Sequence, residues 1–157
     1  EIGAHTRTHR NLTTLSESEQ QAEIQGSRQD LISWGFGSVD SFAVPFGAYN
    51  QTIINAVESD GFDNMATSDG HQLNNPASDR YRLTRFPILN TTTVAQVQQA
   101  IDKADADNAW LILMFHEVNT SGRTYAITPT KFNQIVDYVV AKGIPTVTVS
   151  EGAEELQ

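Results

Sequence analysis

The sequence predicts an α/β fold in which parallel strands are joined by helices. Segments with the apolar spacing of amphipathic helices alternate along the chain with short apolar runs, bounded by Gly or Pro, that are typical of strands. Strands in such an alternation are joined by right-handed crossovers, which makes them parallel. The 157 residues, 39% hydrophobic and 18% charged, match the size and composition of one globular domain. We therefore expect a single domain over residues 1–157.

The first half of the chain is expected to contain two helices and two strands. Ser16 and Glu19 have the spacing of a capping box, which predicts a helix that continues to Trp34. Asn50 is a suitable N-cap for a second helix. The expected strands cover residues 39–44 and 62–67.

The second half is expected to add two long helices and three strands. Thr93 and Gln96 repeat the capping-box spacing at the start of one helix. Thr128 and Pro129 suit the N-cap and first position of the other, which Gly143 ends. We expect strands at residues 81–86, 110–115 (buried) and 146–149, a polar loop at 117–127, and a short final helix capped by Ser150.

Several residues with useful chemistry follow predicted strands. They are His5, the Pro45-Phe46 turn, Asp69 and His116. Functional residues of parallel α/β folds gather at the carboxyl ends of the strands, so these residues are candidates for one shared rim. His71, in the loop after Asp69, is expected to be exposed to solvent.

The composition excludes several kinds of site. A formal net charge of −9 argues against binding to nucleic acid, which requires a basic surface. The chain contains no cysteine, so it has neither disulfides nor thiolate metal sites. No apolar run approaches the roughly 20 residues of a membrane span. Any bound metal must therefore be held by His, Asp, Glu or water.

His5 and His9 are the first candidates for metal ligands. They stand four residues apart, and two imidazoles at that spacing can reach one metal ion from the same side. The alternative is that each ring is an ordinary histidine whose nitrogens are satisfied by hydrogen bonds. The spacing by itself does not decide between the two.

Three stretches together resemble a known family. His5-Thr6-Arg7-Thr8-His9 resembles the zinc-binding His-(Ser/Thr)-x-x-His motif of polysaccharide deacetylases, the NodB-homology family of carbohydrate esterases. Residues 42–50 are similar to its Pro-(Tyr/Phe)-Gly-x-x-Asn motif. Residues 111–117 are similar to its late strand, which ends in a catalytic histidine. The resemblance implies an irregular, incomplete (β/α) barrel of the NodB-homology type.

The family opens with a strand that ends in Asp-Asp, and this stretch does not occur in the chain. It supplies a metal ligand and the general base, so we expect a domain truncated at its N-terminus. The resemblance implies a divalent metal, most often zinc, held by His5 and His9 and by an aspartate outside these residues. Asp69 and Glu117 are weaker candidates for the third ligand.

The resemblance also implies roles for other residues. His116 would be the general acid, Asp69 would orient it, and Arg85 would hold the base. Pro45 and Phe46 would form a turn whose Phe46 N–H binds the oxyanion and whose ring gives the sugar an apolar wall. The family's usual arginine before this turn is absent here, which is why Arg85 is considered. Each residue also has a plain structural reading: a strand cap for His116, a turn residue for Asp69 and a solvated strand residue for Arg85.

The expected function is metal-dependent removal of N-acetyl or O-acetyl groups from a polysaccharide such as chitin, peptidoglycan or xylan, outside the cell or at its envelope. The alternative is a non-catalytic carbohydrate-binding relative that keeps the fold without the base. A zinc protease is disfavoured because Thr6 follows His5, where His-Glu-x-x-His requires glutamate. A serine hydrolase is disfavoured because no Gly-x-Ser-x-Gly turn occurs.

Overall fold

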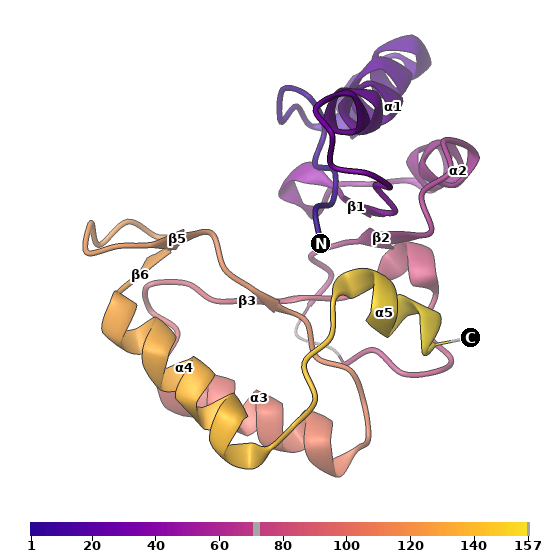
Figure 1. The fold of residues 1–157 in the computed structure, drawn as a ribbon. Coiled ribbons are helices and arrows are strands. Elements are labelled where there is room, and N and C mark those ends of the chain that lie inside the picture. Colours follow the sequence, from indigo (N-terminus) through magenta and orange to yellow (C-terminus); the bar gives the residue numbers. More distant parts are fainter. Residues whose placement is uncertain (71–72, 157) are drawn as a thin grey trace.

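The computed structural model describes residues 1–70 and 73–156, so His71 lies outside the described residues. Helices and short parallel strands alternate along the chain, and the strands do not close into a barrel (Figure 1). The expected α/β class is therefore confirmed. The helices are α1 (Glu17–Ser33), α2 (Gln51–Ser59), α3 (Val94–Ala106), α4 (Pro129–Lys142) and α5 (Val149–Glu154).

The strands pair in parallel, as the alternation of strands and helices predicts. The pairs are β1 (Ser41–Ala43) with β2 (Asn64–Ala66), β3 (Phe86–Pro87) with β4 (Leu113–Met114), and β5 (Glu117–Val118) with β6 (Ala126–Ile127). Parallel bridges extend the first pair on both sides, because Ala4 lies beside Phe42 and Ala66 lies beside Leu83. The segment that carries His5 is therefore aligned with β1 and β2.

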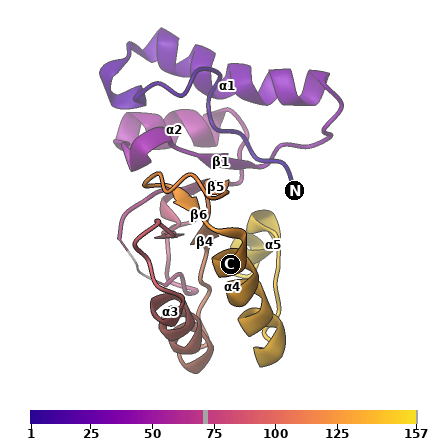
Figure 2. The same ribbon diagram turned by 90° about the vertical axis from the view of Figure 1, so that its left-hand side faces the viewer.

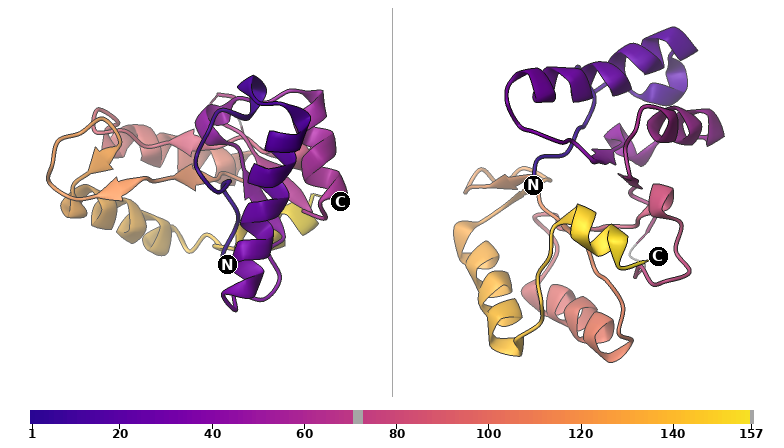
Figure 3. Two further views of the ribbon diagram at one scale, coloured as in Figure 1. Left: turned by 90° about the horizontal axis from the view of Figure 1, so that it is seen from above. Right: turned by 45° about the vertical axis from the view of Figure 1, so that its right-hand side comes forward.

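The apolar side chains form two separate clusters. The first includes Ile24 of α1, Ile53 of α2 and Phe42 of β1, all fully buried. The second is centred on Ile101 of α3 and Ile135 of α4. Figure 2 shows α1 and α2 stacked over β1, with α3 and α4 packed at the other end of the molecule. Figure 3 shows α5 close to the N-terminus, where Ser150 donates its N–H to the Glu1 carboxylate at 3.1 Å.

The helix starts agree with the capping residues seen in the sequence. Complete capping boxes form at Ser16 with Glu19 and at Thr93 with Gln96. The Asn50 side chain accepts the Ile53 N–H at 3.0 Å. Each of these bonds satisfies backbone groups that a helix leaves free at its first turn. α4 ends at Gly143, whose φ of 67° is the left-handed conformation that glycine adopts most easily.

All the predicted strands that form are shorter than expected, and two of them differ most. Within residues 81–86 only Phe86 is in a strand, because residues 80–82 form a 3₁₀ turn that Asp79 caps through the Tyr81 N–H. Within residues 110–115 only β4 is a strand, and its side chains are half-buried rather than buried. Trp110, Leu111 and Leu113 border an open cavity of about 580 Å³, so one face of this segment is left uncovered by the described residues.

Three other boundaries also differ from expectation. Residues 146–147 are not in a strand, and Thr148 rather than Ser150 is the N-cap of the final helix, through a capping box with Glu151. The segment 117–127, expected to be a polar loop, contains β5 and β6. At the end of α1, Trp34 is 70% exposed because the apolar stripe ends before it.

Candidate active site

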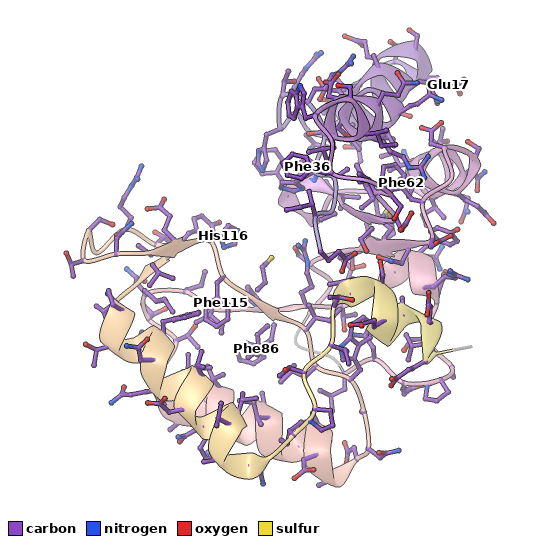
Figure 4. All side chains as sticks on the ribbon, in the orientation of Figure 1. Glu17, Phe36, Phe62, Phe86, Phe115 and His116 are labelled. Carbon is purple, nitrogen blue, oxygen red and sulfur yellow. The ribbon has the colours of Figure 1, made fainter. Side chains whose placement is uncertain are left out.

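The candidate residues lie beside the carboxyl ends of the parallel strands. His5 follows the bridge at Ala4, Pro45 and Phe46 follow β1, and Asp69 follows β2. His116 follows β4, and Figure 4 shows it just past Phe115 at the start of β5. Arg85 stands at the start of β3 instead, on the backbone that leads into that strand.

His5 and His9 are brought together with Phe46. The ring centroids of His5 and His9 are 4.8 Å apart, and those of His9 and Phe46 are 4.7 Å apart, both edge to face. The His5 Nδ1 lies 2.7 Å from the Ala43 carbonyl oxygen. A carbonyl can only accept, so Nδ1 carries the proton and Nε2 keeps a free lone pair. This backbone bond is the kind that orients metal-binding histidines.

The surroundings of His5 favour its neutral form. Burial lowers the pKa of the His5 ring, and the nearby positive charges of His9, Arg85 and His116 act in the same direction. The bond to the Ala43 carbonyl opposes these effects, but the net pKa is below the ordinary value. Neutral imidazole is the form that binds a metal ion. His5 and Arg85 also line the same cavity.

The Pro45-Phe46 turn presents its middle residue to solvent. Residues 45–47 form a 3₁₀ turn in which Phe46 has a φ of 59° and is 67% exposed. Gly47 has a φ of 66°, and a Cβ built on it would lie 2.6 Å from the Ser68 Cβ. The turn is thus packed directly against the end of β2. Within the described part of the chain, no hydrogen bond uses the Phe46 N–H.

Arg85 is held by neutral oxygens. Its Nε donates to the Thr67 carbonyl at 2.7 Å, and one Nη donates to the Ser68 hydroxyl at 3.3 Å. Burial lowers the pKa of its guanidinium. Within residues 1–70 and 73–156, no carboxylate forms an ion pair with Arg85. A cavity of about 340 Å³ lies beside it, and His5 and Phe115 are also on its wall.

Asp69 and His116 each have another partner. The Asp69 carboxylate accepts the Tyr49 hydroxyl, and this bond raises the pKa of Tyr49. The exposed His116 ring packs against Tyr125, with centroids 4.7 Å apart. No hydrogen bond joins Asp69 to His116 among the described residues, so the orienting role of Asp69 stays a prediction.

The comparisons with known proteins concern the fold of the chain. The family model for polysaccharide deacetylase matches residues 1–65. A family 4 carbohydrate esterase from Streptomyces lividans, solved with acetate, is 18% identical over 96% of this chain and 67% of its own, with a TM-score of 0.59. The Xyl-CE4 domain of a multidomain xylanase from the hindgut metagenome of Trinervitermes trinervoides is 21% identical over 99% of this chain and 64% of its own, with a TM-score of 0.63. The chain has the fold of a polysaccharide deacetylase. The resemblance found in the sequence is thereby confirmed.

Other comparisons define how far this deacetylase resemblance extends. A CE4 family pseudoenzyme from Bacillus anthracis is 15% identical, with a TM-score of 0.62, over 99% of this chain and 47% of its own. No curated protein sequence is matched. The chain spans about two thirds of the length of the esterase from Streptomyces lividans and less of the other two. None of the helices in residues 1–70 and 73–156 has the length and apolar content of a membrane span.

The two histidines fit a metal ion of the kind that polysaccharide deacetylases hold, but as a partial site. His5 presents a free Nε2 beside His9, as two ligands must. In the described part of the chain, no three His, Asp or Glu side chains gather around one point that could hold a metal. Asp69 is bonded to Tyr49, and Glu117 pairs with Arg123 at 3.3 Å, so the two weaker candidates for a third ligand have other partners.

Sequence reasoning missed several residues at this deacetylase-like site. Tyr49 lies in the same motif as Phe46, so its position gave a usable signal. Tyr125 gave none, because its contact with His116 depends on how residues 117–127 fold back. One weak sequence signal pointed to Glu23, which is an acidic residue beside Ile24 on the buried face of α1.

Proposed function

We propose that this chain forms part of a metal-dependent deacetylase that hydrolyses N-acetyl or O-acetyl groups on a polysaccharide such as chitin, peptidoglycan or xylan. The observation that carries the proposal is the orientation of His5. Its Nδ1 is committed to the Ala43 carbonyl while its Nε2 is free beside His9. A protein that acts on polymers of this kind would work outside the cell or at its envelope.

The histidines would hold the metal, and other groups would act on the acetyl group. A divalent metal, zinc being the usual partner of histidine, lowers the pKa of a bound water and polarises a carbonyl. As the water oxygen bonds to the acetyl carbon, the Phe46 N–H would donate to the developing oxyanion. His116 would protonate the leaving nitrogen or oxygen as its bond to carbon breaks, which releases acetate. The exposed Phe46 ring would give the sugar an apolar wall.

Arg85 would hold the carboxylate that acts as general base. Among the described residues, the half-buried guanidinium is bonded to neutral oxygens alone, so it retains its full charge for such a partner. The base itself would come from the Asp-Asp stretch that the family carries outside these residues. The cavity beside Arg85 has room for side chains from such a segment.

A non-catalytic carbohydrate-binding protein is the second candidate. It is favoured by the partial metal site, since two ligands rather than three gather in the described residues. The similar fold of a CE4 family pseudoenzyme also supports it, and a mutant of that Bacillus anthracis protein is described as having restored enzymatic activity. Loss of activity within this fold is therefore compatible with a well-formed structure.

The metal site is tested by measuring zinc affinity in this chain and in two variants. We expect His5→Ala and His9→Ala each to abolish tight zinc binding in isothermal titration calorimetry, because each removes one of two ligands. Elemental analysis of the purified chain gives the stoichiometry. If both variants bind zinc as tightly as wild type, His5 and His9 are not the metal ligands, and the proposed metal-dependent reaction is wrong.

The proposed catalysis is tested with a form of the chain extended at its N-terminus by an Asp-Asp segment of the kind found in the family. We expect acetate release from acetylated sugar oligomers, with His116→Ala lowering kcat by about 10²–10⁴-fold, as for loss of a general acid. Zinc content should stay the same, because His116 is not expected to bind the metal. If this form binds the oligomers but releases no acetate, the result favours a non-catalytic carbohydrate-binding protein.

A further inference from the structure

We propose that Glu23 is a positioning residue, which holds the loop between His5 and His9 on helix α1 so that the two rings face one site. The inference rests on the proposed function, because it assigns a role in the same metal site. Glu23 belongs to α1 and lies outside the motifs that suggested the site.

The Glu23 carboxylate is used entirely by the loop between the two histidines. Its Oε2 accepts the N–H of Arg7 at 2.9 Å and the N–H of Thr8 at 2.8 Å. Its Oε1 accepts the Thr8 hydroxyl. All three donors lie between His5 and His9, and Glu23 is only 7% exposed. A buried carboxylate is costly unless its oxygens are bonded, and here the loop supplies all three bonds.

A second contact binds the same loop to the same face of α1. The Arg7 guanidinium forms two parallel hydrogen bonds with Asp30, at 2.6 and 2.7 Å. It lies across Gly26, where a Cβ would come within 2.5 Å of the Arg7 Cζ. Glu23, Gly26 and Asp30 are spaced along one face of the helix, so the loop is anchored at two points about two turns apart.

The backbone of the loop shows why anchoring is needed. Thr6 has a φ of 64° and His9 a φ of 57°, conformations that are unfavourable for residues other than glycine. The Thr6 hydroxyl accepts the His9 N–H at 3.0 Å, which supports the turn locally. Such conformations persist only where the surrounding structure imposes them. The hydrogen bonds to Glu23 come from Arg7 and Thr8, which lie between the two strained residues, so they can hold both Thr6 and His9 in the left-handed conformation.

The role requires a carboxylate. A glutamine of the same size is neutral, so its one accepting oxygen would bind the Arg7 and Thr8 N–H groups less strongly than a carboxylate does, and the Thr8 hydroxyl would have to turn to accept from the NH₂ group. Glu23→Gln should therefore release part of the loop while the packing of Ile24 and the rest of α1 is unchanged. Partners that orient metal-binding residues typically change metal affinity by about 10–100-fold when they are removed.

The experiment compares Glu23→Gln with Glu17→Gln in the full chain. Glu17 is an exposed residue of the same helix (Figure 4) and forms no hydrogen bond or ion pair with the loop among the described residues, so it controls for loss of charge on α1. Zinc ion is the probe in calorimetry, and Co²⁺ gives an absorption spectrum that reports ligand geometry. Amide hydrogen exchange of Arg7 and Thr8 without metal reports the loop itself, and urea unfolding reports global stability.

We expect Glu23→Gln to weaken zinc binding by about 10–100-fold, to alter the Co²⁺ spectrum and to speed exchange at Thr8, with Glu17→Gln like wild type. If Glu23→Gln does not fold, Thr8→Val removes one of the three bonds and should weaken zinc binding by a smaller factor. The inference is overturned if a folded Glu23→Gln variant has the zinc affinity and the Thr8 exchange rate of wild type, in an experiment where His9→Ala does abolish zinc binding. If His9→Ala binds zinc like wild type, the proposed metal site is wrong and the positioning role fails with it.

Discussion

At the residue scale, strained backbone is concentrated where the site was expected. Thr6, His9 and Phe46 all have positive φ values, and all belong to the two motifs that resemble deacetylases. The left-handed conformation costs such residues about 1–2 kcal/mol each. Residues held in this way cluster at sites where geometry is part of the function. The strain therefore supports the site independently of the motif resemblance.

The close packing of Gly47 against Ser68 gives a prediction about stability. Gly47→Ala must adopt a φ of 66° and must also place its Cβ 2.6 Å from the Ser68 Cβ. We expect it to lower the free energy of unfolding by about 1 kcal/mol for the backbone and by about 1–3 kcal/mol more for the clash. Gly143→Ala is the matched control, because its φ is 67° and it has open space around it. Equal urea unfolding curves for the two variants would show that the turn is not packed as described.

At the element scale, the capping boxes of α1 and α3 and the parallel pairing of the strands were predicted correctly, whereas the strand lengths and the N-cap of the last helix were not. Ser16 with Glu19 marked the start of α1 because a capping box is complete within four residues. The strand expected at residues 146–149 failed because Val147 and Thr148 are compatible with a strand or a helix cap, and pairing with a distant segment decides between them. The hydrogen bonds between Glu23 and the loop that joins His5 to His9 could not be predicted for the same reason, since the bonded residues are 15–16 positions apart in the sequence.

The contact between α1 and the end of α2 gives a prediction about pH. Burial raises the pKa of Asp60, while bonding from Gln21 and the charge of Arg28 partly oppose this rise. Its Oδ2 is buried without a partner in the described structure. A carboxyl whose pKa is higher in the folded than in the unfolded state binds its proton more tightly when folded. Its contribution to stability is therefore lost as pH rises from the unfolded value through the folded one.

Asp60→Asn removes this titration, and its effect should depend on pH. Relative to wild type, we expect the variant to gain stability as pH rises from 4 to 7 in urea unfolding. Asp63→Asn, in an exposed neighbour, controls for the loss of one negative charge. A difference between Asp60→Asn and wild type that is constant across this range would show that Asp60 keeps its unfolded-state pKa in the folded protein.

At the scale of the whole molecule, the candidate site lies between two cores. His5, His9 and Phe46 belong to the same segment as the first cluster, whose buried residues lie between 4 and 65 and fall within the part that matches the deacetylase family model. His116 follows the strand that packs on the second cluster. The second cluster is less completely buried than the first, because its Phe86, Leu113 and Phe115 are only half-buried. A reaction that uses both histidine groups therefore depends on the less well covered half keeping its position.

The two cores should also open separately. Native-state hydrogen exchange in low urea should give lower opening free energies for α3 and α4 than for α1 and α2, because fewer of their apolar side chains are fully covered. Ile53→Ala and Ile135→Ala are matched probes, each replacing a buried helical isoleucine, at 0% and 1% exposed. Each should cost about 2–5 kcal/mol in its own cluster. We expect Ile135→Ala to lower protection only in α3 and α4, and Ile53→Ala to lower it in α1, α2 and β1. If both variants lower protection by the same amount throughout the chain, the two clusters are one cooperative unit, and His116 is held as firmly as the His5 and His9 pair.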